Sequence, residues 1–211
     1  MRRLIFFLAT VFLSISVSFA QMKKIENVSL FMKQMEQRVT PVKSVESDFK
    51  QIKHINDFDQ DITSSGKFFY VPSNKICLKY AKPRPYLIVI NGNKIKIESD
   101  GKKNIMNLKD NKQMQEIQYV LSICLSGNFS NISSDYRTEF YEDESFYLAT
   151  IKSVNESVKK DITQFDIYLN KKDMSVGKLR ISETKGDYTE YNFSNIKLNT
   201  LSGEALFKIK N

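Results

Sequence analysis

The sequence predicts a mainly β protein of the α+β class, built on one large antiparallel sheet. Short segments of period-two alternation, rich in Thr, Tyr, Phe and Ile, recur through most of the chain. The connections between them carry turn dipeptides such as Asn91-Gly92 and Asp100-Gly101, and they are too short to hold a crossover helix. Two stretches with helical spacing of apolar residues stand before and between these segments.

The elements can be placed in order along the chain. A first helix is expected over residues 22–39, and Pro41 ends its pattern. The apolar residues that recur there at spacings of three and four are Val28, Phe31, Met32, Met35 and Val39. Six strands are then expected, at 44–55, 61–71, 75–81, 85–91, 94–99 and 103–108. A second helix is expected over 112–125, with Gly127 as its stop. Six further strands are expected at 136–142, 145–152, 161–170, 176–184, 187–196 and 204–209.

About eleven or twelve antiparallel strands therefore form the expected sheet, and a sheet of this size usually curls or closes. The two helices must bury their apolar faces, and the concave side of a curled sheet is the place for them. A small closed barrel fills with its own side chains, whereas a larger or incompletely closed barrel leaves a cavity. The strand pattern leaves this choice open.

The segment 75–99 indicates which face of the sheet is apolar. Ile76, Leu78 and Tyr80 share one face of their strand, because alternate residues of a strand point the same way. On the next two strands the same face carries Tyr86, Ile88, Ile90, Ile95 and Ile97. The opposite face carries Lys75, Cys77, Lys79, Lys94, Lys96 and Glu98. We expect the apolar set to point inward and the lysine-rich set to face water.

The first twenty residues predict a cleavable secretory signal peptide. Arg2 and Arg3 precede an uncharged stretch, and Ser18 and Ala20 place cleavage after residue 20. The alternative is an uncleaved membrane anchor. Residues 21–211 then form a single domain with a sizeable core. Removal of the two arginines lowers the formal net charge from +8 to +6. A basic exported protein suits anionic membrane surfaces or acidic partners and is a poor candidate for binding nucleic acid.

Residues suited to catalysis are sparse. His54 is the single histidine, no Gly-x-Ser-x-Gly motif or Gly-rich phosphate loop occurs, and one histidine with two distant cysteines does not suit a metal site. Cys77 and Cys124 form one disulfide or remain two buried free thiols. The acidic run from Glu142 to Glu144 falls at an expected turn. A hydrolase that uses a carboxylate pair stays an alternative, because such pairs follow no spacing rule.

Several motifs occur in the order found in a known family. "VESDFKQ" at 45–51 contains a Phe-x-Gln strand, and "GKFFYVPSNKICLKYAKPRPYLIVINGNKIKIES" at 66–99 contains a Gly-x-aromatic strand, two prolines and an apolar strand before Asn-Gly. With the signal peptide and the two helices, this order resembles the periplasmic outer-membrane lipoprotein carrier family, LolA. The matching residues are Phe49, Gln51, Gly66, Phe68, Pro72, Tyr80, Pro83, Ile88, Asn91 and Gly92.

The resemblance implies an incomplete β-barrel of the LolA/LppX type under a helical lid. It implies a monomeric periplasmic carrier without catalysis, cofactor or metal, whose apolar cavity takes the acyl chains of a lipoprotein. The implied partners are acylated lipoproteins, the inner-membrane lipoprotein-releasing transporter and an outer-membrane acceptor. The candidate cavity and lid residues are Phe31, Met35, Phe49, Phe68, Ile76, Leu78, Tyr80, Ile88, Ile90, Ile95, Ile97, Leu121 and Leu125.

The chain departs from the family pattern where a lid latch is expected. The family often places an arginine before the first proline, where it can bond to the lid helices, and this chain has Val71 there. Cys77 and Leu78 stand where Arg-Trp is common. The lid is therefore expected to close by apolar contact or through a Cys77–Cys124 link. A lipid-binding sensor or envelope-stress regulator on the same fold is the alternative function.

Overall fold

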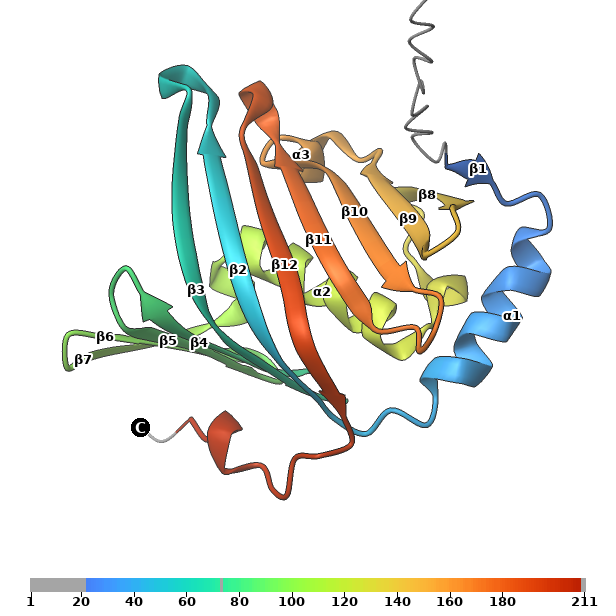
Figure 1. Ribbon diagram of the computed structural model, residues 1–211. Coiled ribbons are helices and arrows are strands. Elements are labelled where there is room, and N and C mark those ends of the chain that lie inside the picture. Colours follow the sequence, from blue (N-terminus) through green and yellow to red (C-terminus); the bar gives the residue numbers. More distant parts are fainter. Residues whose placement is uncertain (1–21, 73, 210–211) are drawn as a thin grey trace, which may run out of the picture.

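The computed structural model describes residues 22–72 and 74–209, so the predicted signal peptide lies outside the described residues. The described chain forms one antiparallel sheet of twelve strands with two main helices (Figure 1). In their order across the sheet, the strands are β1 (Lys23–Lys24), β8 (Tyr136–Glu142), β9 (Phe146–Ser153), β10 (Ile162–Asn170), β11 (Val176–Glu183), β12 (Tyr188–Leu198), β2 (Val45–Ile55), β3 (Gln60–Val71), β4 (Lys75–Lys82), β5 (Tyr86–Asn91), β6 (Lys94–Ser99) and β7 (Lys102–Asn107).

Two meanders build this sheet. Strands β2 to β7 pair with their neighbours in sequence, and so do β8 to β12. The long antiparallel pairing of β12 with β2 joins the two meanders, with Phe193 opposite Phe49. The sheet ends in β1 and β7, so the described strands curl without closing into a barrel. The prediction of one large, incompletely closed antiparallel sheet is confirmed.

The helices begin and end where their caps are. Helix α1 (Val28–Val39) starts after Asn27, whose side chain accepts a hydrogen bond from the Leu30 amide at 3.1 Å. The predicted start at residue 22 is therefore wrong, and residues 23–24 form β1 instead. Helix α2 (Lys112–Ser126) is capped in the same way by Asn111 and ends at Gly127, which has φ +69° as a left-handed C-cap requires.

Shorter helical turns occupy several connections. A four-residue helix, α3 (Glu156–Lys159), joins β9 to β10. Single 3₁₀ turns occur at η1 (Asn56–Phe58), η2 (Leu108–Asp110), η3 (Phe129–Asn131), η4 (Thr184–Gly186) and η5 (Ala205–Phe207). The predicted final strand at 204–209 is wrong, because the chain there forms η5 and no ladder.

The C-terminal segment covers part of the outer face of the sheet. Phe207 is 1% exposed and packs with Phe69, Cys77 and Val89, while its carbonyl accepts a hydrogen bond from the Asn91 amide group at 3.0 Å. These residues have the parity opposite to that of the inner core. The prediction that Cys77 faces water is therefore wrong, since the returning chain buries both faces of β4 at this point.

The main core lies between the inner face of the sheet and the two helices. Figure 1 shows α2 lying across the hollow of the curled sheet, with α1 beside the β8–β9 end. Phe31 of α1 contacts the rings of Phe140 in β8 and Tyr147 in β9, with ring centroids 5.1 and 4.8 Å apart. The expectation that the helices bury their apolar faces on the concave side of the sheet is confirmed.

Candidate functional site

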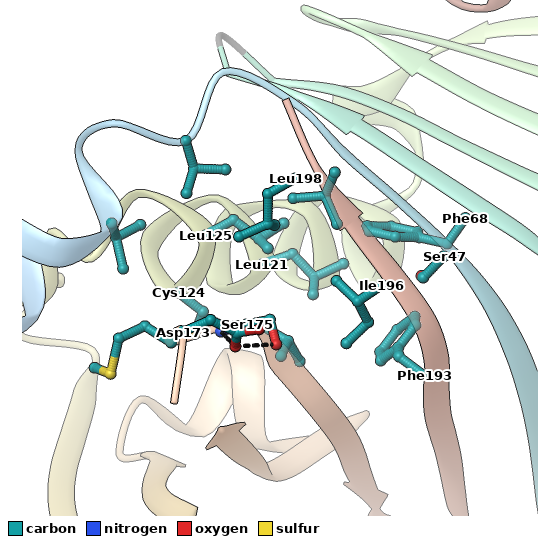
Figure 2. Close-up of a pocket in the computed structure, with 15 residues that line it drawn as sticks. Ser47, Phe68, Leu121, Cys124, Leu125, Asp173, Ser175, Phe193, Ile196 and Leu198 are labelled. Atoms are coloured by element: carbon teal, nitrogen blue, oxygen red, sulfur yellow. Dashed lines mark hydrogen bonds between the residues drawn. The ribbon is translucent and has the colours of Figure 1, made fainter. Parts of the chain in front are cut away.

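A cavity of about 30 Å³ lies on the inner face, between α2 and the strands β2, β3 and β12 (Figure 2). Apolar side chains form most of its wall. Helix α2 contributes Leu121, Cys124 and Leu125, and β12 contributes Phe193, Ile196 and Leu198. A second cavity of similar size lies farther along α2, lined by Ile117, Leu121 and Phe68 among others. The space beneath the helix is therefore apolar and nearly filled.

Polar groups interrupt this wall at two places. At one, the hydroxyl of Ser175 donates to the Asp173 carboxylate at 2.6 Å and accepts from the Asn170 amide at 2.8 Å. At the other, Ser47 of β2 is only 2% exposed, and its hydroxyl has no hydrogen-bond partner among the described residues. Figure 2 shows Ser47 beside Phe68, away from the Asp173–Ser175 pair. The cavity thus has one satisfied polar pair and one unsatisfied hydroxyl.

A bulge in β12 shapes the wall next to Ser47. Ser194 lies opposite Asp48 and Lys197 opposite Glu46, so two residues of β12 face the single residue Ser47. One of these two, Asn195, has φ +53°, and the other is Ile196, which lines the cavity. A bulge bends its strand and redirects side chains. It therefore positions Ile196 at the cavity while leaving the ladder irregular beside Ser47.

Polar contacts of Glu116 and Tyr119 tie α2 to the β8 side of the sheet. The hydroxyl of Tyr136 donates to the Glu116 carboxylate, and the hydroxyl of Tyr119 accepts a hydrogen bond from the Ser133 amide at 2.7 Å. Burial raises the pKa of the Glu116 carboxyl above its ordinary value. Toward β3 and β12, the helix presents the apolar residues that line the two cavities.

An arginine latch is present at a position that the sequence analysis missed. Arg38, in the last turn of α1, donates from Nη2 to the backbone carbonyls of Lys171 and Lys172, at 2.8 Å each. These carbonyls belong to the turn between β10 and β11, and the same turn supplies Asp173 and Ser175 to the cavity. The latch therefore runs from helix to sheet, whereas the family pattern expects the arginine on a strand. An exposed arginine at the end of a helix carries no local sequence signal for such a bond.

The thirteen predicted cavity and lid residues all join the main core. Ten of them are buried, and Leu78, Ile88 and Ile97 are partly buried against the same cluster. Of the thirteen, only Phe68, Leu121 and Leu125 line the first cavity. Leu78 lines the second cavity, together with Phe68 and Leu121. Sequence reasoning missed lining residues from irregular segments, among them Val42, Met174 and Ile196.

The proposed link between Cys77 and Cys124 is absent. Both cysteines are buried free thiols. Cys124 lies in the main core, whereas Cys77 lies under Phe207 on the outer face, so the sheet separates the two. Burial raises the pKa of the Cys77 thiol to about 11 and raises that of Cys124 further. The alternative prediction, two buried free thiols, is confirmed.

The acidic run at 142–144 has a structural role. Asp143 accepts hydrogen bonds from the amides of Ser145 and Phe146, both at 2.7 Å, which builds the turn between β8 and β9. Glu142 pairs with Lys171 at 2.6 Å. Among residues 22–72 and 74–209, no group of three or more His, Cys, Asp or Glu side chains is placed to hold a metal ion. No helix in the described part of the chain is long and apolar enough to cross a membrane.

The sequence profile of the outer membrane lipoprotein carrier protein LolA matches residues 40–210, which include all of the sheet except β1. The chain belongs to the LolA family. The sequence motifs around Phe49, Gly66 and Asn91-Gly92 led to the same family, so the resemblance is confirmed. No curated protein matches this LolA-family chain by sequence.

Solved structures resemble this LolA-family chain at low identity. A DUF1329 family protein from Desulfovibrio piger has a TM-score of 0.51 at 10% identity, over 88% of this chain and 98% of its own. MucB has a TM-score of 0.50 at 11% identity, over 86% of this chain, and the match spans 63% of MucB. A putative outer membrane lipoprotein-sorting protein domain from Vibrio parahaemolyticus has a TM-score of 0.45 at 14% identity, over 84% and 95% of the two chains. At these identities the first two likenesses support the fold alone.

Proposed function

We propose that this protein is a soluble periplasmic carrier that shields the acyl chains of lipoproteins under helix α2. It would receive them from an inner-membrane lipoprotein-releasing transporter and deliver them to an acceptor at the outer membrane. The observation that carries the proposal is the family match over residues 40–210, on a sheet whose inner face is apolar beneath a helix. A monomer with a basic surface suits this role, because anionic membrane surfaces attract it.

The cost of exposing acyl chains explains why such a carrier is needed. Each buried methylene is worth roughly 0.8 kcal/mol, so a sixteen-carbon chain costs on the order of 12 kcal/mol to expose to water. Two or three such chains cannot cross an aqueous compartment unshielded. A binding protein must therefore offer apolar surface of its own, and the inner face of this sheet is the apolar surface that the fold provides.

Under this proposal, helix α2 must move before cargo can enter the space beneath it. Ligand cavities usually measure about 300–1,000 Å³, whereas the cavity here measures about 30 Å³. Apolar contacts, which have no directional preference, hold α2 against β3 and β12. Its polar contacts through Glu116 and Tyr119 lie on the β8 side. We infer that α2 lifts on the β12 side while the β8 side acts as the hinge.

A reconstitution experiment tests the function. The mature chain is mixed with a triacylated lipoprotein in detergent, the detergent is removed, and lipid vesicles are added and sedimented. We expect the lipoprotein to stay in solution as a one-to-one complex, measured by native mass spectrometry. The same lipoprotein without its acyl chains is the control and should form no complex. Lipoprotein that sediments with the vesicles whether or not the chain is present would contradict the proposal.

Two further measurements separate the alternatives, namely co-isolation with a partner and product release from the lipoprotein. MucB has been crystallised in complex with MucA, and its fold resembles this one. The alternative of a lipid-binding sensor or envelope-stress regulator predicts a protein that binds lipid but is isolated together with a transmembrane regulator. A carboxylate-based hydrolase would release a product from the lipoprotein, and that activity would disappear on removal of one carboxylate from an intact fold.

A further inference from the structure

We propose that the hydroxyl of Ser47 donates a hydrogen bond to the carbonyl oxygen of an ester-linked acyl chain bound under α2. The inference rests on the proposed carrier function. It adds that the site recognises a polar group of the ligand, the ester carbonyl oxygen. The ligand class is thereby narrowed from any apolar chain to an acyl ester, the linkage in the diacylglyceryl group of a lipoprotein. No covalent step is involved.

The first argument is the state of the hydroxyl. Ser47 is 2% exposed, it lines the cavity, and its oxygen has no hydrogen-bond partner among the described residues. Buried polar groups in folded proteins nearly always have a partner, because burying an unpaired one is unfavourable. The neighbours of Ser47 along the inner face of β2, Val45 and Phe49, are apolar core residues. A serine between them therefore requires an explanation that packing does not provide.

The second argument is the shape of the wall around the hydroxyl. Ser47 faces Phe68 of β3 on one side and the irregular stretch of β12 at Asn195 and Ile196 on the other. Bulges occur preferentially next to functional sites, where they redirect side chains. The part of the cavity wall near Ser47 is mostly hydrocarbon, supplied by Phe68, Phe193 and Leu198. A ligand that satisfies this site is apolar along most of its length and carries one hydrogen-bond acceptor, as an acyl ester does.

A trapped water fits the site less well. The cavity has room for about one or two water molecules, but a buried water needs two to four polar partners. Among the side chains of the described lining residues, Ser47 alone has a buried polar atom without a partner. Asp173 and Ser175 bond to each other and lie apart from Ser47 in Figure 2. Within this cavity, a water at Ser47 would therefore find no second unpaired side-chain group to bond.

The test compares ester-linked with ether-linked chains. The probes are a dipalmitoylglyceryl-cysteine peptide and its dihexadecyl ether analogue, which lacks the carbonyl oxygens. Their affinities for wild type and Ser47→Ala are measured by displacement of an apolar fluorescent dye. Ser153→Ala is the matched control, because Ser153 is also a buried serine without a partner but lies in β9 and does not line the cavity.

We expect Ser47→Ala to weaken binding of the ester about three- to tenfold and to leave binding of the ether unchanged. Ser153→Ala should change neither. An ester with an isotope-labelled carbonyl should also show a lower carbonyl stretching frequency in wild type than in Ser47→Ala, which a purely structural role would not produce. A diester phosphatidylglycerol and its diether analogue serve as a second pair of probes. The pair for which Ser47→Ala causes the larger ester-specific loss of affinity shows whether the acyl ester comes from a lipoprotein or from a phospholipid.

Two results would overturn the inference while the carrier function stands. Ser47→Ala could leave binding of both probes unchanged, or it could weaken both equally, as a packing defect would. Failure of wild type to bind either probe would instead overturn the proposed function, and the inference with it.

Discussion

The hydroxyl groups of Tyr80 and Tyr191 lie 3.2 Å apart, although their strands, β4 and β12, are separated in the sheet by β2 and β3. Three strand spacings in a flat sheet amount to about 14 Å. The two side chains meet only because the sheet curls sharply at this point. Phe49 of β2 lies between them and contacts both rings, at centroid distances of 4.9 and 5.8 Å. Tyr191 also lines the second cavity, beneath Ile117 and Leu121 of α2.

The tyrosine pair predicts a pH-dependent change in stability. Burial raises the pKa of Tyr191 to about 12, above the unfolded value of about 10. The folded state therefore holds this proton more tightly, and the resulting stabilisation is present below pH 10 and lost as the pH rises toward 12. Tyr191→Phe removes the hydrogen bond and should cost about 1 kcal/mol at pH 7. In urea unfolding, the difference in free energy of unfolding between wild type and Tyr191→Phe should become smaller above pH 10. A difference that stays constant from pH 7 to 11 would contradict the account.

Gly66 allows β3 to approach β4 closely beside Tyr80. A Cβ at this position would lie 2.8 Å from Cα of Tyr80 and closer still to the carbonyl oxygen of Lys79, where the β3–β4 ladder shifts register. Gly66→Ala should therefore lower the free energy of unfolding by about 1–3 kcal/mol. Gly203→Ala is the control, because its Cβ meets no described atom within 4 Å. Equal urea midpoints for the two variants would show that the close approach is unimportant.

The packing of Phe207 predicts protection of one cysteine. Phe207→Ala should loosen the C-terminal segment and make the Cys77 thiol at least tenfold more reactive toward an alkylating agent, while Cys124 stays protected in the main core. Leu206→Ala is the matched control, since Leu206 is 41% exposed. Peptide mass spectrometry distinguishes the two cysteines. If Cys77 in Phe207→Ala reacts no faster than in wild type, the C-terminal segment is not what buries it.

The Arg38 latch predicts a local effect on α1. Arg38→Ala removes two hydrogen bonds to the β10–β11 turn and should destabilise the docking of α1 by about 0.5–1.5 kcal/mol. Hydrogen exchange should then become faster in the amides of α1 and stay unchanged in those of β2 and β12. Lys33→Ala, an exposed position on the same helix, should have no such effect. Uniform acceleration across the sheet would indicate a global role instead.

The faces of the strands could be predicted from the sequence. Ile76 and Ile90 were expected to point inward and do so, because alternation assigns every residue of a strand to one face once one residue is assigned. Alternation does not reveal what covers the other face. Cys77 was expected in water and is buried, since the chain after β12 returns over β4 and β5. Apolar residues alternate at Ala205, Phe207 and Ile209, as they would in a strand. The pattern arises instead because this segment packs against the sheet on one side only.

The cavity was less predictable, and the reason is physical. The cavity lies where side chains leave part of the space under α2 unfilled. The packing of segments that are distant in the sequence determines where that is. Ser47 and Ile196 meet because of a bulge in β12, which no period-two pattern reports. The wall residues Met174 and Ser175 come from a turn that only the folded sheet brings under α2.

Photocrosslinking tests the central claim, that acyl chains bind between α2 and the inner face, most directly. Benzoylphenylalanine is placed at Leu121, which lines both cavities, or at Leu206 on the outer face as the control. The variant chains are loaded with a triacylated lipopeptide and irradiated. The account predicts crosslinks to the acyl carbons from position 121 and none from position 206. Crosslinks from position 206 alone, or equal yields from both positions, would contradict it.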